Sequence, residues 1–264
     1  MRILVTGCSG FLGSAITHKL SQEGHEVIGI DVLPPIDFSG VWEFKRFDLS
    51  SPSLESDLTK DVGPCEAIVH AGACLSKDPL SKELSTVNCA GTHRLARLAS
   101  QWGSRVFVYL SSVPVIGKPK KLPITEDHPL NPLTLYHASK LYGEYVIAHV
   151  PADFRKVILR ITSPVGPGLK RRTIFTVFAE NAANGSPLGV SGRGTRVQNY
   201  VDARDVASSV AKSLYSALAR GVYNISGPKS ISNLELAKTF IRLLNSSSTI
   251  LTGITEDPEE GVIW

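Results

Sequence analysis

The sequence contains few cysteines and no long apolar run. Its four cysteines, Cys8, Cys65, Cys74 and Cys89, lack the spacing of metal ligands or redox pairs, so we expect reduced thiols and no metal site. No stretch of about 18 apolar residues is present to span a bilayer, so we expect no membrane contact. The first residues also lack the charged and apolar regions of a secretory signal, which favours a cytoplasmic protein.

A strong charge of either sign is also missing. The net charge is only +4, and lysine and arginine gather in two short clusters, at 118–121 and 170–172. Clusters of this size do not indicate nucleic-acid binding. Hydrophobic residues at 42% and charged residues at 20% are instead typical of a globular enzyme, and 264 residues can bury a substantial core.

The segment 2–13, RILVTGCSGFLG, predicts a strand that turns directly into a helix. Gly7, Gly10 and Gly13 lie where the backbone turns tightly and can approach a diphosphate at the N-terminus of that helix. The spacing is G-x-x-G-x-x-G, which differs from the G-x-G-x-x-G of many dinucleotide folds. Glycine-rich turns without a ligand are common, so this motif alone does not show that the chain binds a dinucleotide.

A second buried strand, at 26–30, ends on Asp31. In a dinucleotide fold, an acidic residue about 20 positions after the glycine motif accepts hydrogen bonds from the adenosine ribose. An aspartate at this place also repels a 2′-phosphate. Asp31 therefore predicts NAD as the cofactor in preference to NADP.

Further strands are predicted at 42–47, 65–70, 105–110 and 155–160. Between them, helical periodicity predicts a helix at 79–101, and Asn131 followed by Pro132 predicts the N-cap and first turn of another. The alternation of strands and helices predicts an α/β fold with a Rossmann-type, doubly wound parallel sheet. Ligands of such sheets lie outside the carboxyl ends of the strands.

The regular alternation of strands and helices ends after residue 162. Glycine-rich loops alternate with predicted helices at 173–184 and 204–218, and Ser232 with Glu235 forms a capping box at the start of a last helix. We therefore expect an NAD-binding domain at 1–162. Residues 163–264 are expected to form a small C-terminal substrate lobe, with some segments returning to the sheet.

Tyr136 and Lys140 lie four residues apart and so share one helix face. Taken alone, such a pair is more often an ordinary surface pair. The other motifs change this interpretation. In order along the chain they are TGCSGFLG, Asp31, Asp48-Leu49, His70-Ala71-Gly72-Ala73, Asn88, Ser111-Ser112, Tyr136-His137-Ala138-Ser139-Lys140, and Arg160 through Pro164-Val165-Gly166.

This ordered set resembles the extended short-chain dehydrogenase/reductase family, in particular its NAD-dependent sugar epimerase/dehydratase branch, over about residues 1–245. The resemblance implies that Tyr136 removes a proton from a sugar hydroxyl, that Lys140 bonds the nicotinamide ribose, and that Ser112 hydrogen-bonds the reacting oxygen. The charges of Lys140 and of an oxidised nicotinamide would favour the tyrosine phenolate. The residues expected to contact NAD are Gly7, Gly10, Phe11, Leu12, Gly13, Asp31, Asp48, Leu49, Ala71, Gly72, Ala73, Asn88, Ser111, Tyr136 and Lys140.

Several positions depart from the pattern of that branch. Its dehydratases carry an Asp-Glu pair after the serine, where this chain has Val113 and Pro114, so dehydration is excluded. Ser163 occupies the position of an asparagine that is often found in the Asn-Pro-x-Gly stretch, and Gln198 aligns with an arginine that often grips the nucleotide diphosphate. The expected substrate residues are therefore Ser112, Ser163, Gln198 and a substitute arginine, for which Arg193, Arg196 and Arg204 are the candidates.

The leading hypothesis is an NAD-dependent epimerase that oxidises a nucleotide-linked sugar transiently to a keto intermediate. Gln198 and the early end of the chain favour an alternative, an NAD(H)-dependent dehydrogenase or reductase of a smaller sugar or hydroxy/keto substrate. A third hypothesis is a non-catalytic NAD-binding sensor. The resemblance also implies a homodimer, formed through the helices predicted at 79–101 and 132–150.

Overall fold

The computed structural model describes residues 1–76, 78 and 80–264, and its largest element is a seven-stranded parallel sheet. The strand order is β10-β6-β5-β4-β1-β2-β3, which confirms the doubly wound α/β fold. The direction of winding reverses between β1 and β4, and ligands of such sheets bind at the carboxyl ends of the strands at this point. The strands are β1 (Arg2–Thr6), β2 (Glu26–Asp31), β3 (Glu43–Arg46), β4 (Ala67–His70), β5 (Val106–Ser112), β6 (Arg155–Ile161) and β10 (Gly221–Ile225).

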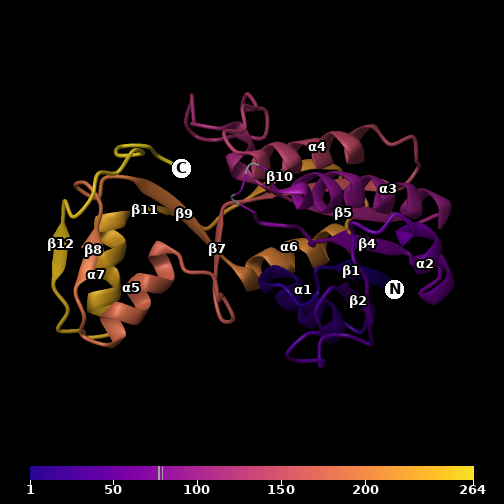
Figure 1. Cartoon of the computed structure of the whole chain (residues 1–264), viewed down its shortest axis with the longest axis horizontal. Coiled ribbons are helices and arrows are strands. Elements are labelled where there is room, and N and C mark those ends of the chain that lie inside the picture. The colour runs from indigo at the N-terminus through magenta and orange to yellow at the C-terminus, as the bar shows by residue number, and fades with distance from the viewer. Residues whose placement is uncertain (77, 79) are drawn as a thin grey trace.

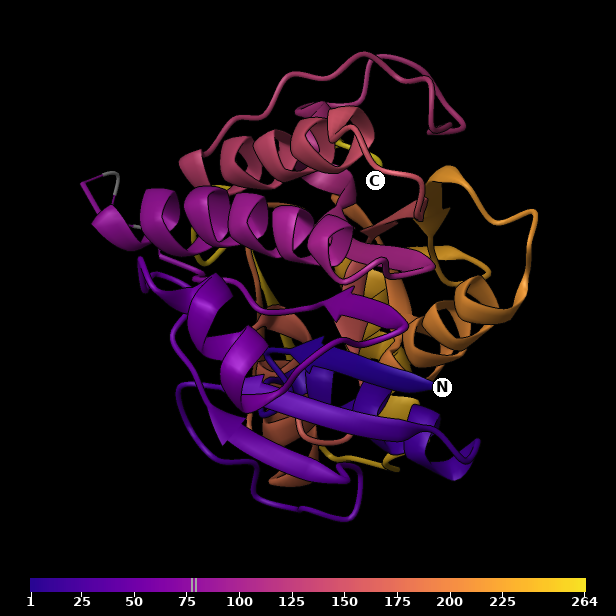
Figure 2. The ribbon, with the colours of Figure 1, turned by 90° about the vertical axis from the view of Figure 1, so that its right-hand side faces the viewer.

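Helices cover both faces of this sheet, which explains why its central strands are apolar on both sides. On one face α3 (Thr92–Gln101) and α4 (Leu135–His149) run side by side (Figure 2). On the other face α1 (Phe11–Gln22) packs against α6 (Ala203–Tyr215) (Figure 1). Two separate clusters of buried apolar side chains, one on each face, form the main core.

Two helix predictions need correction. The helix predicted at 79–101 divides into a π-helical segment, η1 (Leu84–Gly91), and α3, while Pro79 lies outside the described residues. The prediction of Asn131 as an N-cap was wrong. The backbone amide of Asn131 instead donates to the Val115 carbonyl (3.0 Å). The Thr134 hydroxyl caps α4 by accepting from the backbone amide of His137 (3.2 Å). A helix that the periodicity did not indicate, α2 (Leu54–Asp61), precedes β4.

A smaller lobe lies at the opposite end of the molecule from the large sheet (Figure 1). It has its own apolar cluster, and the predicted capping box of Ser232 and Glu235 is confirmed. Helix α6 and strand β10 return to the large sheet. The elements of the lobe and its connection are β7 (Ser163–Val165), α5 (Ile174–Ala183), β8 (Leu188–Val190), β9 (Val197–Asp202), β11 (Ser230–Ser232), α7 (Asn233–Leu243) and β12 (Ile250–Thr252). Among the described residues, no helix is long and apolar enough to cross a membrane.

Candidate active site

The glycine turn between β1 and α1 brings two backbone segments into direct contact. Gly7 has a φ of 69°, and a Cβ added to it would lie 2.5 Å from the Gly72 Cα after β4. A Cβ on Gly13 would lie 1.9 Å from the Gly7 carbonyl oxygen. Side chains at either position would therefore displace the backbone. Gly7 and Gly13 are thus required by the close approach of β1, α1 and the β4 turn.

The N-terminus of α1 has the features of an anion site. Its N-cap is Gly10, no described side chain caps the helix, and its first turn, which includes Phe11 and Leu12, contains no acidic residue. The leading amides of a helix point outward and carry a partial positive charge, which suits a diphosphate. The dinucleotide predicted from the sequence therefore fits this cradle.

Asp31 lies at the end of β2, beside the glycine turn. Its carboxylate accepts hydrogen bonds from the Ser9 amide (3.1 Å) and the Val32 amide (2.7 Å). The Ser9 hydroxyl in turn donates to the Leu33 carbonyl (2.6 Å). Asp31 thus fixes the glycine turn to the second strand, in a place where its carboxylate can also face a ribose.

Other predicted cofactor residues form the wall around the glycine turn. Leu49 is buried, and its side chain contacts the backbone positions of Gly72 and Gly91. Ala71 and Ala73 flank Gly72 directly after β4, and both are partly buried. Asp48 is exposed and accepts from the Ser50 amide (2.8 Å), so it lies at the rim.

His70 forms a buried network under this wall, a role that the sequence pattern did not indicate. The Thr92 hydroxyl donates to the Asn88 carbonyl (2.6 Å), so it must accept from His70 Nε2 (2.9 Å). The other ring nitrogen, Nδ1, then accepts from the Thr6 hydroxyl (2.7 Å), which itself accepts from the Gly72 amide (3.1 Å). Burial lowers the pKa of His70 to about 3. The ring is therefore neutral and ties β1, β4 and α3 together.

Asn88, on η1, connects the segment after β4 with α4 through both the oxygen and the nitrogen of its side-chain amide. Its oxygen accepts from the Cys74 amide (2.7 Å), and its nitrogen donates to the Cys74 carbonyl (3.0 Å) and the Ser139 hydroxyl (2.9 Å). The Ser139 hydroxyl donates to the Tyr136 carbonyl (2.7 Å). Asn88 therefore anchors the helix turn that carries Tyr136.

The three predicted catalytic residues lie on elements that pack against each other. Ser112 is the last residue of β5, while Tyr136 and Lys140 lie on the first turns of α4, which packs on that strand. Lys140 is buried, with its ammonium over the Tyr109 ring at 4.8 Å from the centroid. Because β5, β4 and β1 are parallel neighbours, the carboxyl end of β5 lies at the same edge of the sheet as the glycine turn.

Burial changes the proton affinity of both titratable residues of this group. It raises the pKa of Tyr136 to about 12, a rise that the Arg171 charge opposes. It lowers the pKa of Lys140 to about 8, while the Glu144 carboxylate acts in the opposite direction. The protein alone therefore holds Tyr136 as a neutral phenol, and a phenolate requires further positive charge.

Ser111 lies beside Ser112 but faces away from the crevice. It is buried, and its hydroxyl donates to the Glu144 carboxylate. Strand alternation explains this difference, since neighbouring residues of a strand point to opposite faces.

A hollow of about 420 Å³ lies next to Ser112, between the large sheet and the small lobe. Ser163, Arg196 and Gln198 all line it, and the Ser163 hydroxyl lies 3.5 Å from the Gln198 side-chain oxygen. Arg196 forms an ion pair with Glu259 in the same hollow. The structure thus brings three of the predicted substrate residues together.

The other candidate arginines lie elsewhere. Arg193 is exposed and pairs with Glu260, and both line a separate hollow of about 910 Å³ in the lobe. Arg204 pairs with Asp202 at the start of α6. The hollow next to Ser112 also contains Val113 and Pro114 of the short helix η2 (Val113–Ile116), which follows Ser112. Within the described residues, no cluster of three or more histidine, cysteine, aspartate or glutamate side chains could hold a metal ion.

Comparisons with known proteins agree with this geometry. A protein of Mycolicibacterium smegmatis named UDP-glucose 4-epimerase is 31% identical over 232 residues, which cover 80% of this chain and 72% of that protein. A Streptomyces niveus protein named dTDP-glucose 4,6-dehydratase is 27% identical over 278 residues, 98% of this chain and 82% of that protein. The crystal structure of a Thermus thermophilus UDP-glucose 4-epimerase in complex with NAD superposes with a TM-score of 0.84 at 25% identity, and the match covers 100% of this chain and 90% of that one.

The family model described as the NAD dependent epimerase/dehydratase family matches residues 3–226, and its members include sugar epimerases and dehydratases of the extended short-chain dehydrogenase/reductase type. The resemblance found in the sequence is thereby confirmed. This chain belongs to the NAD-dependent epimerase/dehydratase family.

Proposed function

We propose that this protein is an NAD-dependent 4-epimerase of UDP-linked sugars. The observation that carries the proposal is the placement of Ser112, Tyr136 and Lys140 on β5 and α4, beside a glycine cradle that fits a dinucleotide. The relatives named UDP-glucose 4-epimerase support a UDP-linked sugar as the substrate and C4 as the carbon that is inverted. Residues 1–162 would bind the cofactor, and residues 163–264 would mainly shape the substrate pocket.

The glycine turn and the N-terminus of α1 would hold the diphosphate of NAD, and Asp31 would hold a ribose. When bound, NAD supplies an acceptor that takes a hydride from the sugar and returns it. The negative charge of Asp31 disfavours a 2′-phosphate. The preference for NAD over NADP therefore depends on a single carboxylate.

Tyr136 acts as the general base toward the 4-hydroxyl of the sugar, and Ser112 holds the same oxygen by a hydrogen bond. Because burial raises the pKa of Tyr136 to about 12, the phenolate depends on nearby positive charge. Lys140, on the next turn of α4, and the oxidised nicotinamide would together provide this charge. Tyr136 then returns its proton to the oxygen when the inverted alcohol forms.

The hollow beside Ser112 receives the nucleotide end of the substrate. Ser163 and Gln198 provide hydrogen bonds, and Arg196 provides the cation for the diphosphate, with Glu259 as its partner until the substrate enters. The hollow contains Val113 and Pro114 where dehydratases of this type carry an acid pair. Neither residue can donate or accept a proton through its side chain, so water elimination has no acid or base there.

Turnover of UDP-glucose by the NAD-loaded protein tests the proposal. We expect UDP-galactose to form until equilibrium, without net NADH, and a Tyr136→Phe variant to lose about 10²-fold or more of kcat while it still binds NAD. Stoichiometric NADH would support the alternative, a dehydrogenase of a smaller substrate, for which the uncharged Gln198 argues. Full biological activity of the Tyr136→Phe variant would support the non-catalytic sensor.

We further propose a homodimer that pairs α3 and α4 with their copies. Tyr142 and Tyr145 on α4 are large, exposed and on the outer side of this helix pair, as an interface requires. Light scattering should give twice the chain mass, and Tyr145→Glu should give the monomer. A monomeric wild type would refute the dimer.

We also propose the cytoplasm as the compartment. All four cysteines are free, and Cys8 and Cys65 are buried, as suits a reducing environment. Fractionation of cells should find the protein with cytoplasmic markers, and recovery from a membrane or secreted fraction would contradict this.

A further inference from the structure

Residues 259–264 form a strap along one rim of the hollow of about 420 Å³. The strap pairs with β9 through a single residue. The backbone amide of Val197 donates to the Val262 carbonyl (2.9 Å), and the backbone amide of Trp264 donates to the Val197 carbonyl (3.1 Å). The apolar cluster of the lobe comprises residues between 174 and 250, so the strap lies outside it. Segments with few backbone hydrogen bonds and few buried contacts open at a low free energy, without unfolding of the rest.

Glu259 of the strap holds the cation of the hollow. Its carboxylate lies 2.5 Å from Nη2 of Arg196, the residue directly before β9. Of the described residues that line the hollow, Arg196 is the one lysine or arginine, and Glu259 is the one acidic residue. The strap therefore neutralises the charge that the hollow would offer to an anion.

The closed strap leaves buried polar atoms without partners. Nε of Arg196, Oε2 of Glu259 and Nε1 of Trp264 are three of the six buried side-chain nitrogen and oxygen atoms that have no hydrogen-bond partner among the described residues. The contact between Arg196 and Glu259 is thus an ion pair without an aligned hydrogen bond. Unpaired buried donors and acceptors disfavour the arrangement that buries them. A diphosphate can accept two parallel hydrogen bonds from one guanidinium, and so suits Arg196 better than Glu259 does.

Trp264 carries the strap across to the large domain. Its side chain packs against the apolar cluster of Val113, Val115 and Ile116 on η2. Its main-chain oxygen accepts from the Ser230 hydroxyl of the lobe (3.0 Å). Trp264 and Val113 both line the hollow. The strap therefore closes the hollow between the lobe and the large domain.

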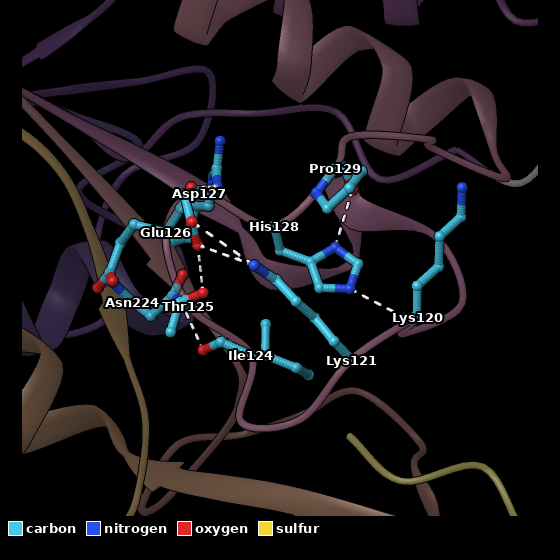
Figure 3. A network of polar contacts seen from close by, with 10 residues as sticks. Lys120, Lys121, Ile124, Thr125, Glu126, Asp127, His128, Pro129 and Asn224 are labelled. Atoms are coloured by element: carbon cyan, nitrogen blue, oxygen red, sulfur yellow. Dashed lines mark hydrogen bonds and ion pairs between the residues drawn. The ribbon is translucent and has the colours of Figure 1, made fainter.

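Another wall of the hollow, at 122–124, is held by the polar network of Figure 3. The Asn224 side chain on β10 donates to the Ile124 carbonyl (3.1 Å), and the Asn224 backbone amide donates to the Glu126 carboxylate (2.8 Å). In the same loop, His128 is buried and accepts a hydrogen bond from a backbone amide through Nε2 (3.0 Å). These bonds fix the loop to the edge of the large sheet, so we expect the hollow to open at the strap rather than at this wall.

We propose that the strap is an autoinhibitory contact: with Glu259 on Arg196 and Trp264 across the hollow, it excludes the substrate diphosphate, which must displace the strap to bind. The inference rests on the proposed function only for the choice of a nucleoside diphosphate. The carboxylate and the diphosphate compete for one guanidinium. The apparent affinity for substrate is therefore reduced by the fraction of molecules in which the strap is open. Any change that loosens the strap strengthens binding.

The affinity of the NAD-loaded protein for UDP, measured by calorimetry, tests this without turnover. Glu259→Gln should lower the Kd about fivefold, the effect of one partly exposed ion pair. Trp264→Ala should lower the Kd as well, because it also favours the open strap. Glu256→Gln is the matched control. It removes an exposed carboxylate from the neighbouring segment, which lines the separate hollow in the lobe, and it should leave the Kd unchanged.

The fluorescence of Trp264 reports the movement of the strap directly. UDP should shift the tryptophan emission of the wild type to longer wavelength, because the indole leaves an apolar contact for water. The shift should be absent from Trp264→Phe, which keeps the other two tryptophans, Trp42 and Trp102.

An unchanged Kd in Glu259→Gln, or binding of UDP without a Trp264 emission shift, would overturn the proposal. Weaker binding by Trp264→Ala would also overturn it, since the indole would then belong to the substrate site. A merely structural strap predicts lower melting temperatures at the wild-type Kd. If Trp264→Ala does not fold, Glu259→Gln and the emission decide.

The proposed function fails on a different result. A wild type that forms no UDP-galactose from UDP-glucose would refute that function, while tighter binding of UDP by Glu259→Gln would leave the strap intact. Conversely, a wild type that turns over UDP-glucose, with the same UDP affinity in Glu259→Gln, would refute the strap alone.

Discussion

Replacement of Lys140, the proposed catalytic lysine, by methionine should make the protein more stable at neutral pH. Burial lowers the pKa of Lys140 from its ordinary value of 10.5 to about 8. At about 1.36 kcal/mol for each tenfold change in proton affinity, the folded state loses about 3 kcal/mol by holding the charge. A swap of similar volume in a packed site costs about 1 kcal/mol. Lys140→Met should therefore raise the free energy of unfolding by about 2 kcal/mol at pH 7 while it removes activity.

The pH dependence gives this prediction its sign. Because the folded pKa lies below the unfolded one, the unfolded chain binds the extra proton between about pH 8 and 10.5, and wild-type stability gains from this group as the pH rises through that window. The advantage of Lys140→Met should then shrink to about zero by pH 10.

Urea unfolding of both proteins at pH 7 and pH 10 measures the difference directly. Lys238→Met, on the exposed side of α7, is the matched control and should show the same small effect at both pH values. If Lys140→Met is equally destabilising at pH 7 and pH 10, Lys140 does not carry a costly buried charge and the reasoning fails.

Three further predictions concern the cofactor site and its support. In Gly13→Ala the new Cβ meets the Gly7 carbonyl at 1.9 Å, so NAD should no longer raise the melting temperature; a wild-type shift would contradict the cradle. Asp31→Ser should weaken NAD binding about tenfold or more, by calorimetry, and raise the ratio of NADP to NAD affinity, whereas an unchanged ratio would exclude Asp31 as the selector. Burial lowers the pKa of His70 from 6.5 to about 3, so its ring takes up a proton only on unfolding and wild-type stability falls as the pH drops through that window. His70→Gln should lose less stability there in chemical denaturation, and parallel curves for the two proteins would count against a neutral buried ring.

The repeated elements of the fold could be predicted because their signals are local. Residues 3–5 read as a buried strand, and Ile3, Leu4 and Val5 are fully buried. Asp31 could also be predicted from a local signal, because its spacing from the glycine turn is that of the acidic residue at the end of the second strand, and it is the last residue of β2. Patterns of this kind depend on neighbouring residues and on a fixed chain geometry.

Contacts between distant residues could not be predicted in this way. His70 reaches Thr6 and Thr92 across 64 and 22 positions, and Arg196 meets Glu259 only after the lobe has folded. Glu144 looks like any helix glutamate until β6 brings Arg160 beside it. The Thr134 cap was missed because the more familiar Asn131-Pro132 pair competes with it. In the structure the backbone amide of Asn131 bonds to the Val115 carbonyl, and the helix begins only at Leu135.

The fate of a label at the reacting carbon tests the central claim most directly. UDP-glucose deuterated at C4 would be incubated in ordinary water with the NAD-loaded protein, and the product would be analysed by NMR. If Tyr136 removes only the hydroxyl proton while the carbon-bound hydride is taken and returned within the site, UDP-galactose must keep its deuterium at C4. A product that has exchanged the label with water, or no UDP-galactose at all, would contradict the account.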